Sequence, residues 1–457
     1  MKKIINLLSI SILFLSACTP GSTPTADSPA LLTATNTPKP APTVETVSRL
    51  EVKEEALRGL EITVWTPWYG IESSLFDSFV EEFNTKNQWG IKVTAQSQAN
   101  FANLYENVTA SLPTADKPDM VIALPEHALE WNLDGVVTDL TPYVSDPIYG
   151  FDISDIPPVF FNQDVSGETR VALPAQRTAR LLLWNKTWAS ELGFDAPPDA
   201  PDDFKQQACR AQQSMLKDAS AQNDFMGGWV VDTEPSTAYS WMLAFGGGVL
   251  DDGNNYRFLA PKNTEAFKFL RNLSESQCAW QTAATDPITA FVTREALFIT
   301  ASLEDLTLVS RAFASASNTD EWNVTAFPGE SADAFAIYGS SYVIFNSTGE
   351  SQLASWLFAR WLLEQEQDKR WVETTNLLPL RTSTLDLLTD YRKTHPQWEQ
   401  AVALLPQGAM QPQLASWRRV KVMLGDGFTQ MYRVNLPSGQ VAALLAQMQS
   451  TAEELSK

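Results

Sequence analysis

Two aromatic residues, Trp68 and Tyr69, directly follow the first strand-like segment of the chain, on a loop that begins with Thr66 and Pro67. Indole and phenol rings present large, flat apolar faces, and such faces stack well on the C–H faces of sugars. The alternative is a hydrophobic pair that only packs the loop against the body of the protein. We interpret the pair as a candidate carbohydrate contact.

A carboxylate and an imidazole, Glu126 and His127, follow the third strand-like segment. A carboxylate can accept hydrogen bonds from two hydroxyl groups at once, which suits a polyol ligand. The alternative is that Glu126 caps the next helix. These two residues are therefore a second pair of candidate ligand contacts.

The sequence lacks the usual signatures of catalysis. It has neither a Gly-x-Ser-x-Gly elbow nor a P-loop, and the glycines at 246–248 do not follow a strand as a dinucleotide site requires. Its only histidines, His127 and His395, and its scattered cysteines do not form a metal-ligand cluster. We expect no cofactor and no metal, although abundant carboxylates leave a glycosidase pair open.

Segments of alternating strand and helix character would position these residues. Residues 60–65 read as a strand, 75–83 repeat apolar residues at helical spacing, and 91–95 form a second strand. This order is typical of a parallel βαβ unit. A helix at 101–111 and a continuous apolar strand at 119–124 complete a three-layer α/β lobe.

The alternation continues through the rest of the chain. Further strands are expected at 170–174, 180–185, 296–299, 322–327 and 342–345, and further helices at 202–219, 237–245, 264–274, 356–363 and 441–448.

The first residues are typical of a sorting signal. Lys2 and Lys3 precede a short apolar run that ends in Leu-Ser-Ala-Cys at Cys18, which looks like a lipobox, the motif of bacterial lipoproteins. The resemblance implies cleavage of a signal peptide at 1–17 and acylation of Cys18; an ordinary signal peptide with an incidental cysteine is the alternative. Residues 18–58 should form a lipidated, disordered Thr/Pro-rich tether, because they contain few large apolar residues.

The net charge limits the possible binding partners, and the cysteine content predicts a crosslink. The formal net charge of −21 argues against nucleic acid and against an anionic membrane surface, so contact with the membrane is expected only through the lipid anchor. Cys209 and Cys278 are an even pair in an oxidising compartment, which predicts a disulfide. Two buried free thiols are the alternative.

Segments spread from Leu60 to Lys457 match, in order, the hallmarks of one family. They are Glu61 to Trp65 with the helix that contains Phe76 and Phe83, Pro118 to Ile122, Ala172 to Pro174 with Leu182 to Lys186, Ala244 to Gly247, Gly339 to Ile344, and Leu378 to Arg381. The chain resembles the extracellular solute-binding proteins of bacterial ABC transporters (family 1), the group with the maltose- and glycerol-phosphate-binding proteins, in a lipoprotein form.

The resemblance implies an α/β fold of the two-lobed periplasmic-binding-protein type (type II), with mixed sheets flanked by helices, a hinge and a ligand cleft. We expect lobe 1 at 59–168 and 290–335, and lobe 2 at 169–289 and 336–457. The ligand binds in the cleft and the lobes close over it. The closed form, expected to be a monomer, would dock on ABC permease subunits at the extracytoplasmic face of the cytoplasmic membrane.

The resemblance also adds candidate ligand contacts. Glu234, Ser236 and Tyr239 correspond to a stretch before the family's double glycine, Ser302 to a loop that follows a strand, and Arg381 to a loop often near the cleft. An arginine there could pair with a phosphate or a carboxylate.

Two departures from the family pattern weaken the prediction of a maltodextrin ligand. Ser236 stands where the maltose-binding members have an aromatic residue, and the loop with Ser302 lacks their usual Gly and Trp. Further candidate ligand contacts are Asp305, Trp229 and Tyr338.

Together these patterns predict a non-catalytic lipoprotein that captures a carbohydrate or related polyol and delivers it to an ABC importer. A receptor that presents ligand to a membrane sensor kinase has the same sequence features. A lipoprotein glycosidase is the third alternative.

Overall fold

The computed structural model describes residues 47–281, 286–332, 334–433 and 436–457. The predicted signal peptide, Cys18 and the tether up to residue 46 lie outside these ranges. Residues 47–58 were expected in the tether but belong to the folded body: Ser48 Oγ and the Arg49 N–H donate to the Asp146 carboxylate at 3.0 and 2.7 Å. Leu57, in the short helix η1 (Glu54–Leu57), is fully buried and fixes this segment.

Within the described ranges the strands form two main sheets. The first has the order β2-β1-β3-β13-β6. β1 (Glu61–Thr66) is parallel to β2 (Lys92–Ser97) and to β3 (Met120–Ala123). β13 (Ser341–Ile344) is antiparallel to both β3 and β6 (Leu173–Pro174). We call the body around this sheet lobe 1.

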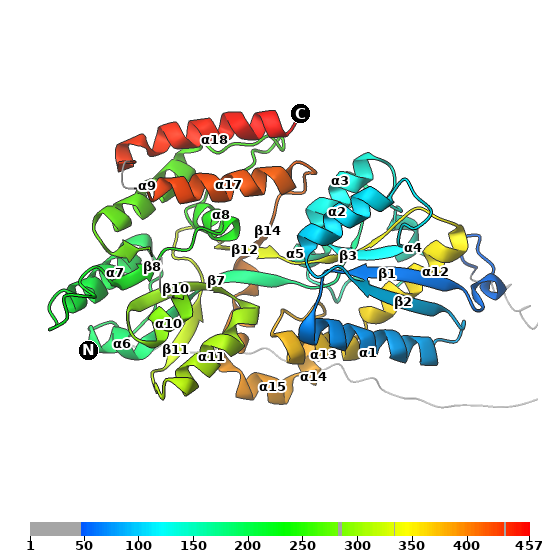
Figure 1. The fold of residues 1–457 in the computed structure, drawn as a ribbon, viewed down its shortest axis with the longest axis horizontal. Helices are drawn as coiled ribbons and strands as arrows, with labels where there is room; N and C mark the ends of the chain where they lie inside the picture. The colour runs from blue at the N-terminus through cyan, green and yellow to red at the C-terminus, as the bar shows by residue number, and fades with distance from the viewer. Residues whose placement is uncertain (1–46, 282–285, 333, 434–435) are drawn as a thin grey trace, which may run out of the picture. The chain divides into compact units, whose positions relative to one another are not determined.

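Helices cover both faces of the lobe 1 sheet (Figure 1). α1 (Gly70–Lys86), α12 (Gly349–Leu362) and α13 (Gln365–Thr375) lie together on one side, and α2 (Phe101–Ser111) and α3 (Pro125–Leu133) on the other. The two sides have separate apolar clusters, because successive side chains of a strand point to opposite faces. In β3, Ile122 joins the cluster of α1, and Val121 joins the cluster that includes Leu104 of α2.

The second sheet is built around β7 (Thr178–Asn185), a strand in which seven of the eight residues are buried. β10 (Ala296–Ser302) runs antiparallel to β7 along one side, and is parallel to β8 (Gly227–Val230). β9 (Ala279–Trp280) lies at that edge, parallel to β8. We call the body around this sheet lobe 2.

Two strands share the other side of β7. β12 (Phe335–Tyr338) pairs antiparallel with its first residues and β11 (Trp322–Thr325) with its last. β14 (Gly408–Met410) then pairs parallel with β12.

Lobe 2 is covered by helices on both faces (Figure 1). They are α6 (Lys186–Glu191), α7 (Pro201–Met215), α8 (Pro235–Ala244), α9 (Pro261–Glu275), α10 (Pro287–Val292), α11 (Leu306–Ser315), α16 (Pro396–Ala403), α17 (Trp417–Met431) and α18 (Val441–Leu455). The remaining elements are short: α4 (Thr141–Val144), α5 (Pro158–Phe161), η2 (Asn162–Asp164), β4 (Val165–Ser166), β5 (Thr169–Arg170), η3 (Leu303–Asp305), α14 (Thr384–Leu387), α15 (Thr389–Thr394), η4 (Leu405–Gln407) and η5 (Ser438–Gln440).

The strand pairing contradicts part of the expected lobe boundaries. Segment 290–335, expected in lobe 1, contributes β10 and β11 to the lobe 2 sheet. Residues 336–457, expected in lobe 2, contribute β13, α12 and α13 to lobe 1. The reason is that β10 and β13 are wholly buried and each fills a central place between two strands, which the order of elements along the chain does not reveal.

A disulfide joins Cys209 of α7 to Cys278, with a Cα–Cα distance of 4.5 Å. The two glycines that begin β8 let its backbone run between these segments. A Cβ on Gly228 would lie 1.9 Å from the Cys278 carbonyl oxygen, and one on Gly227 would lie 2.6 Å from the Ala211 carbonyl oxygen. Strand β8, α7 and the segment around Cys278 therefore form one tightly packed edge of lobe 2.

We predict that the Cys209→Ala/Cys278→Ala variant has a lower melting temperature than the wild type. The bond closes a loop with a sequence separation of 69 residues, for which the chain-entropy model gives about 4 kcal/mol. Differential scanning calorimetry measures the change, and dithiothreitol should lower the melting temperature of the wild type only. An unchanged melting temperature in both experiments would contradict the prediction.

Candidate ligand-binding cleft

Two short crossings that join the lobes lie side by side. Residues 175–177 link β6 to β7, and residues 339–340 link β12 to β13. The Ser340 carbonyl oxygen accepts hydrogen bonds from the N–H groups of Ala175 and Gln176, at 2.9 and 3.1 Å. A Cβ on Gly339 would lie 2.0 Å from the Gln176 carbonyl oxygen, so this approach requires glycine. The chain crosses a third time between α13 of lobe 1 and α16, where Gln400 accepts a hydrogen bond of 2.9 Å from the Val324 N–H of β11.

A buried ion pair holds the crossings to lobe 1. The Arg177 guanidinium contacts the Asp164 carboxylate at 2.8 Å, and both side chains are fully buried. Arg177 also donates to the Ser340 carbonyl oxygen at 2.5 Å, and Ser341 Oγ donates to Asp164 at 2.5 Å. The pair therefore bonds to both crossings at once.

Polar side chains of lobe 2 gather just beyond the crossings. Arg180 of β7 donates to the Asp232 carboxylate through Nε and Nη2, at 3.2 and 2.5 Å, and to Ser302 Oγ at 2.9 Å. Ser302 Oγ lies 2.6 Å from the Tyr338 hydroxyl. Thr237 bonds to both Arg180 and Asp232. The charge of Arg180 is thus balanced within lobe 2.

Two carboxylates from different lobes, Glu304 and Glu72, have shifted pKa values. Glu304 of η3 accepts a hydrogen bond of 2.6 Å from Thr178 Oγ1 and stays exposed to solvent. Desolvation by the surrounding protein nevertheless raises its pKa. Desolvation, and next the charge of Glu304, raise the pKa of Glu72 in the first turn of α1. We place the cleft beside the crossings, where Tyr338 and Gly339 line a cavity that both lobes share.

Ion pairs cross between the lobes at α3 and α17. Lys421 of α17 contacts the buried carboxylate of Glu126 at the start of α3. Arg418 contacts Glu130 at 2.6 Å, and its guanidinium lies 4.3 Å from the centre of the Tyr105 ring. A cavity of only about 30 Å³ separates the lobes here, lined among others by Glu126, Tyr338 and Lys421.

The aromatic pair that the sequence suggested is split by the structure. Trp68 is 4% exposed, its Nε1 donates to Gln176 at 3.2 Å, and its ring centre lies 4.9 Å from that of Trp371. Trp68 therefore packs in lobe 1, as the alternative interpretation had it. Tyr69, 74% exposed, is the residue before α1.

The structure also separates Glu126 from His127. Glu126 lies at the contact between the lobes, as described above. His127 points into lobe 1, where its ring lies between those of Tyr105 and Trp131, at centre distances of 4.8 and 5.8 Å. Burial lowers the pKa of His127 to about 4, so the ring is neutral at pH 7 and serves packing.

The candidates taken from the family resemblance lie at different places. Ser302 and Tyr338 belong to the cleft network. Tyr239 is buried near it: its ring centre lies 6.0 Å from that of Trp417, and its hydroxyl donates to the Met410 carbonyl oxygen at 3.0 Å. Glu234, the residue before α8, is exposed, and Ser236 in the first turn of α8 is half-buried. Asp305 of η3 accepts a hydrogen bond from the Ser302 N–H. Trp229 of β8 is fully buried in the lobe 2 core.

Arg381 is held within lobe 1. Its Nε donates to the Leu363 carbonyl oxygen at 2.5 Å, and its Nη1 lies 3.3 Å from the Asp155 carboxylate. Its charge is therefore already partnered by protein, which argues against the proposed pairing with an anionic ligand.

Sequence reasoning missed five residues at the cleft. They are Glu72, Gln176, Arg180, Glu304 and Lys421. Arg180 carried a usable signal, because a charged residue inside an otherwise apolar strand needs a partner. Glu72 and Glu304 carried none, since a carboxylate in a first helical turn is ordinary on any helix.

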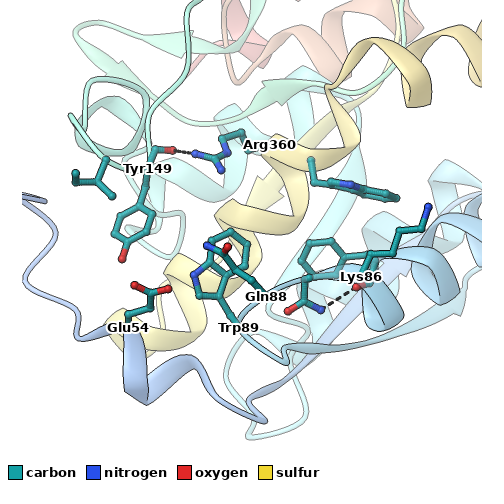
Figure 2. Close-up of a pocket in the computed structure, with 10 residues that line it drawn as sticks. Glu54, Lys86, Gln88, Trp89, Tyr149 and Arg360 are labelled. Atoms are coloured by element: carbon teal, nitrogen blue, oxygen red, sulfur yellow. Dashed lines mark hydrogen bonds between the residues drawn. The ribbon is translucent and has the colours of Figure 1, made fainter.

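A larger hollow, of about 390 Å³, lies elsewhere in lobe 1 (Figure 2). Glu54, Trp89, Tyr149 and Trp361 are among its lining residues, and Arg360 donates to the Tyr149 carbonyl oxygen at 2.9 Å. All lining residues belong to lobe 1, so movement of the lobes cannot close this hollow, and it contains none of the predicted contacts. A site that closes when the lobes move must lie between them, so the smaller cavity is the better candidate for ligand binding.

Within the described ranges, no three His, Cys, Asp or Glu side chains are grouped to hold a metal ion. Nor does any helix in the same ranges have the length and apolar character needed to cross a bilayer.

Comparison with known proteins identifies the family. Residues 78–406, most of the chain, match the model of the bacterial extracellular solute-binding proteins. The chain belongs to this family. Its members are substrate-binding proteins and not enzymes, which excludes the glycosidase alternative and places the protein outside the cytoplasm.

Solved structures of other solute-binding proteins share the fold. The sugar-binding protein MalE of Xanthomonas citri superposes with a TM-score of 0.74 at 18% identity, over 86% of this chain and 97% of its own. A cyclic maltosyl-maltose-binding protein of Arthrobacter globiformis gives 0.71 at 18%, over 86% and 98%. UgpB of Mycobacterium tuberculosis, solved with glycerophosphocholine, gives 0.70 at 20%, over 86% and 98%. These confirm the two-lobed α/β fold.

We predict that His127→Phe flattens the dependence of stability on pH. The unfolded chain binds a proton near pH 6.5, whereas folded His127 binds it only near pH 4. Stability is therefore lost as pH falls through this window, by about 3 kcal/mol from this group. Phenylalanine keeps the ring contacts and does not titrate.

Urea unfolding at pH 7 and pH 4.5 tests this prediction. The wild type should lose more stability than the variant between the two values. Equal losses would show that His127 does not contribute to acid sensitivity.

Proposed function

We propose that this solute-binding protein captures a carbohydrate or related polyol between its lobes and delivers it to an ABC importer, while a lipid on Cys18 holds it at the membrane. The observation that carries the proposal is the set of hydroxyl, amide and charged groups that both lobes present beside the crossings. Ser302, Tyr338, Glu304 and Gln176 offer donors and acceptors of the kind that recognise hydroxyl groups.

The size of the cavity supports a cycle of opening and closing. A space of about 30 Å³ is suited to a water molecule and not to a sugar. A sugar can therefore enter only if the lobes separate, and the closely bonded crossings at Gln176 and Gly339 are the natural pivot. Separation breaks the contacts of α17 with α3, and closure restores them.

The ligand experiment is a thermal-shift screen of mono- and oligosaccharides and of glycerol phosphodiesters on the body of the protein. A ligand bound to the folded state raises the melting temperature by mass action. At least one compound of this panel should do so. No shift with any of them, together with a shift from a peptide, would contradict a polyol ligand.

Lys421→Gln tests the role of closure. Without this lysine the carboxylate of Glu126 lies unpaired between the closed lobes, which disfavours closure. We predict that the Kd for any ligand found rises about tenfold, roughly 1.4 kcal/mol. Lys205→Gln, on the exposed side of α7, makes the same change of charge and should leave the Kd unchanged. Equal affinities for the two variants would show that the pair does not assist closure.

The anchor is tested by Cys18→Ser in the full-length chain. We predict that the wild type fractionates with membranes and the variant does not, because one hydrophobic modification would be lost while the body is unchanged. Immunoblots of membrane and soluble fractions measure this. A variant that remains in the membrane fraction would contradict lipidation at Cys18.

A further inference from the structure

The hollow of lobe 1 has the size of a small-molecule site. Its volume is about 390 Å³, and ligand pockets are typically about 300–1,000 Å³. The described residues that line it come from η1, the end of α1 and the loop after it, the segment around Tyr149, and α12. All of these belong to lobe 1, so the hollow does not depend on how far the lobes are apart. We call it the lobe 1 pocket.

Aromatic rings form much of the wall of the lobe 1 pocket (Figure 2). Trp89, Tyr149, Trp361 and Phe83 line it. The ring centres of Phe83 and Trp361 lie 5.5 Å apart, which fixes both rings against each other. Trp89 and Trp361 are only half-buried. They therefore offer indole faces of the kind on which the C–H face of a sugar stacks.

The loop that contains Trp89 is held in place by one amide. Asn87 Nδ2 donates to the carbonyl oxygens of Phe83 and Ile91 at 2.8 and 2.9 Å, and its Oδ1 accepts from the Ile91 N–H at 2.8 Å. These bonds tie the end of α1 to the residue before β2. A wall that is already ordered loses little entropy when a ligand binds.

The lobe 1 pocket contains a cation that has no carboxylate partner. Arg360 of α12 donates through Nη1 to the carbonyl oxygens of Tyr149 and Gly150, at 2.9 and 3.4 Å. Among the described residues, Glu364 acts on it by charge alone, without an ion pair or a hydrogen bond. Burial lowers the pKa of Arg360, because the protein solvates the charge less well than water does. An anion in the pocket would restore this lost solvation.

A buried donor gives a second, independent sign of a ligand. The Nε1 of Trp89 is buried and has no hydrogen-bond partner. A buried donor that lacks an acceptor is unfavourable, and a ligand oxygen in the pocket can supply the acceptor. The other charged lining residues do not meet either need. Lys86 pairs with Glu82 at 2.8 Å, and Glu54 is exposed.

We propose that the lobe 1 pocket is a second binding site, and that it takes a sugar residue with a carboxylate, such as a uronic acid in a glycan. The carboxylate pairs with Arg360, the sugar ring stacks on an indole face, and a sugar oxygen accepts from Trp89 Nε1. The site is separate from the cleft of the proposed function, and the lobes need not move to fill it.

The charge of the whole chain narrows the glycan further. A formal net charge of −21 repels a polyanion. The ligand is therefore a glycan that is mostly neutral and carries an isolated acidic residue. A single unpaired guanidinium recognises one carboxylate and has no partner for the next.

The position of the lobe 1 pocket suggests its use. Glu54 of η1 lines it, and Ser48 bonds to Asp146, two residues before Ile148 of the same wall. The pocket thus lies beside the segment that continues toward Cys18. A glycan bound here would hold lobe 1 and leave lobe 2 free to move.

Matched disaccharides test the carboxylate on the full-length wild-type protein. Glucuronosyl-glucose and galacturonosyl-galactose carry one carboxylate each, and their methyl esters keep the ring without the charge. Isothermal titration at pH 7 should show that at least one free acid binds about tenfold more tightly than its ester. Free acids that bind no more tightly than their esters would overturn the proposal.

Two variants locate the site. Arg360→Gln removes the charge and should weaken binding of the preferred acid about tenfold, to the level of the ester. Trp89→Phe keeps an aromatic ring but removes the Nε1 donor, and should weaken binding of both acid and ester about fivefold. Arg210→Gln, an exposed residue of α7 in lobe 2, is the matched control and should change nothing. Melting curves confirm that each variant folds.

Lys421→Gln separates this site from the cleft. This variant is expected to weaken the ligand that binds between the lobes, and it should leave binding of the acidic disaccharide unchanged. If Lys421→Gln weakens the acid and Arg360→Gln does not, the acid binds in the cleft and the second site is overturned, while the proposed function stands. A protein that binds the acid through Arg360 but no ligand in the cleft would contradict the proposed function alone.

Discussion

The fully buried ion pair between Arg177 and Asp164 is the constraint on which the arrangement of the protein depends. Removing one partner of such a pair typically costs about 3–5 kcal/mol, since the other charge is left in a medium that cannot solvate it. Arg177 lies in one crossing and also bonds to Ser340 in the other. The two crossings are therefore held at one position relative to lobe 1. The positions of the groups that follow the crossings depend on it.

The polar groups of the cleft follow from this placement. Three residues after Arg177, Arg180 enters the lobe 2 sheet and organises Asp232 and Ser302. On the other side, Gln176 connects the crossing to Trp68 at the end of β1. Residues 176–180 thus connect to the polar groups of lobe 1 on one side and of lobe 2 on the other. A ligand bound beside them would contact both lobes.

Local patterns predicted the elements well, and long-range pairing poorly. The helix at 101–111 has the expected bounds, because Asn100 caps it and accepts from the Asn103 N–H. The lobe boundaries were wrong because β10 and β13 are wholly buried, and such strands fit the centre of either sheet. Hydrogen bonding across more than 100 residues decides between the sheets, and no local pattern contains that information.

The candidate site shows the same contrast between local patterns and long-range contacts. Residue chemistry drew attention to the segments that follow β1 and β3 and to the end of β10. It could not distinguish which neighbour turns inward: Trp68 packs into the core and His127 packs between two rings. Pairing of Glu126 with Lys421, 295 positions away, was beyond sequence reasoning for the same reason.

The N-terminal docking contacts have a mechanical consequence. Ser48, Arg49 and Leu57 attach the start of the described chain to lobe 1 alone, through Asp146 and the apolar core. A force applied at residue 47 would therefore act on lobe 1. If Cys18 carries the proposed lipid, lobe 2 could move relative to lobe 1 without displacing the point of attachment.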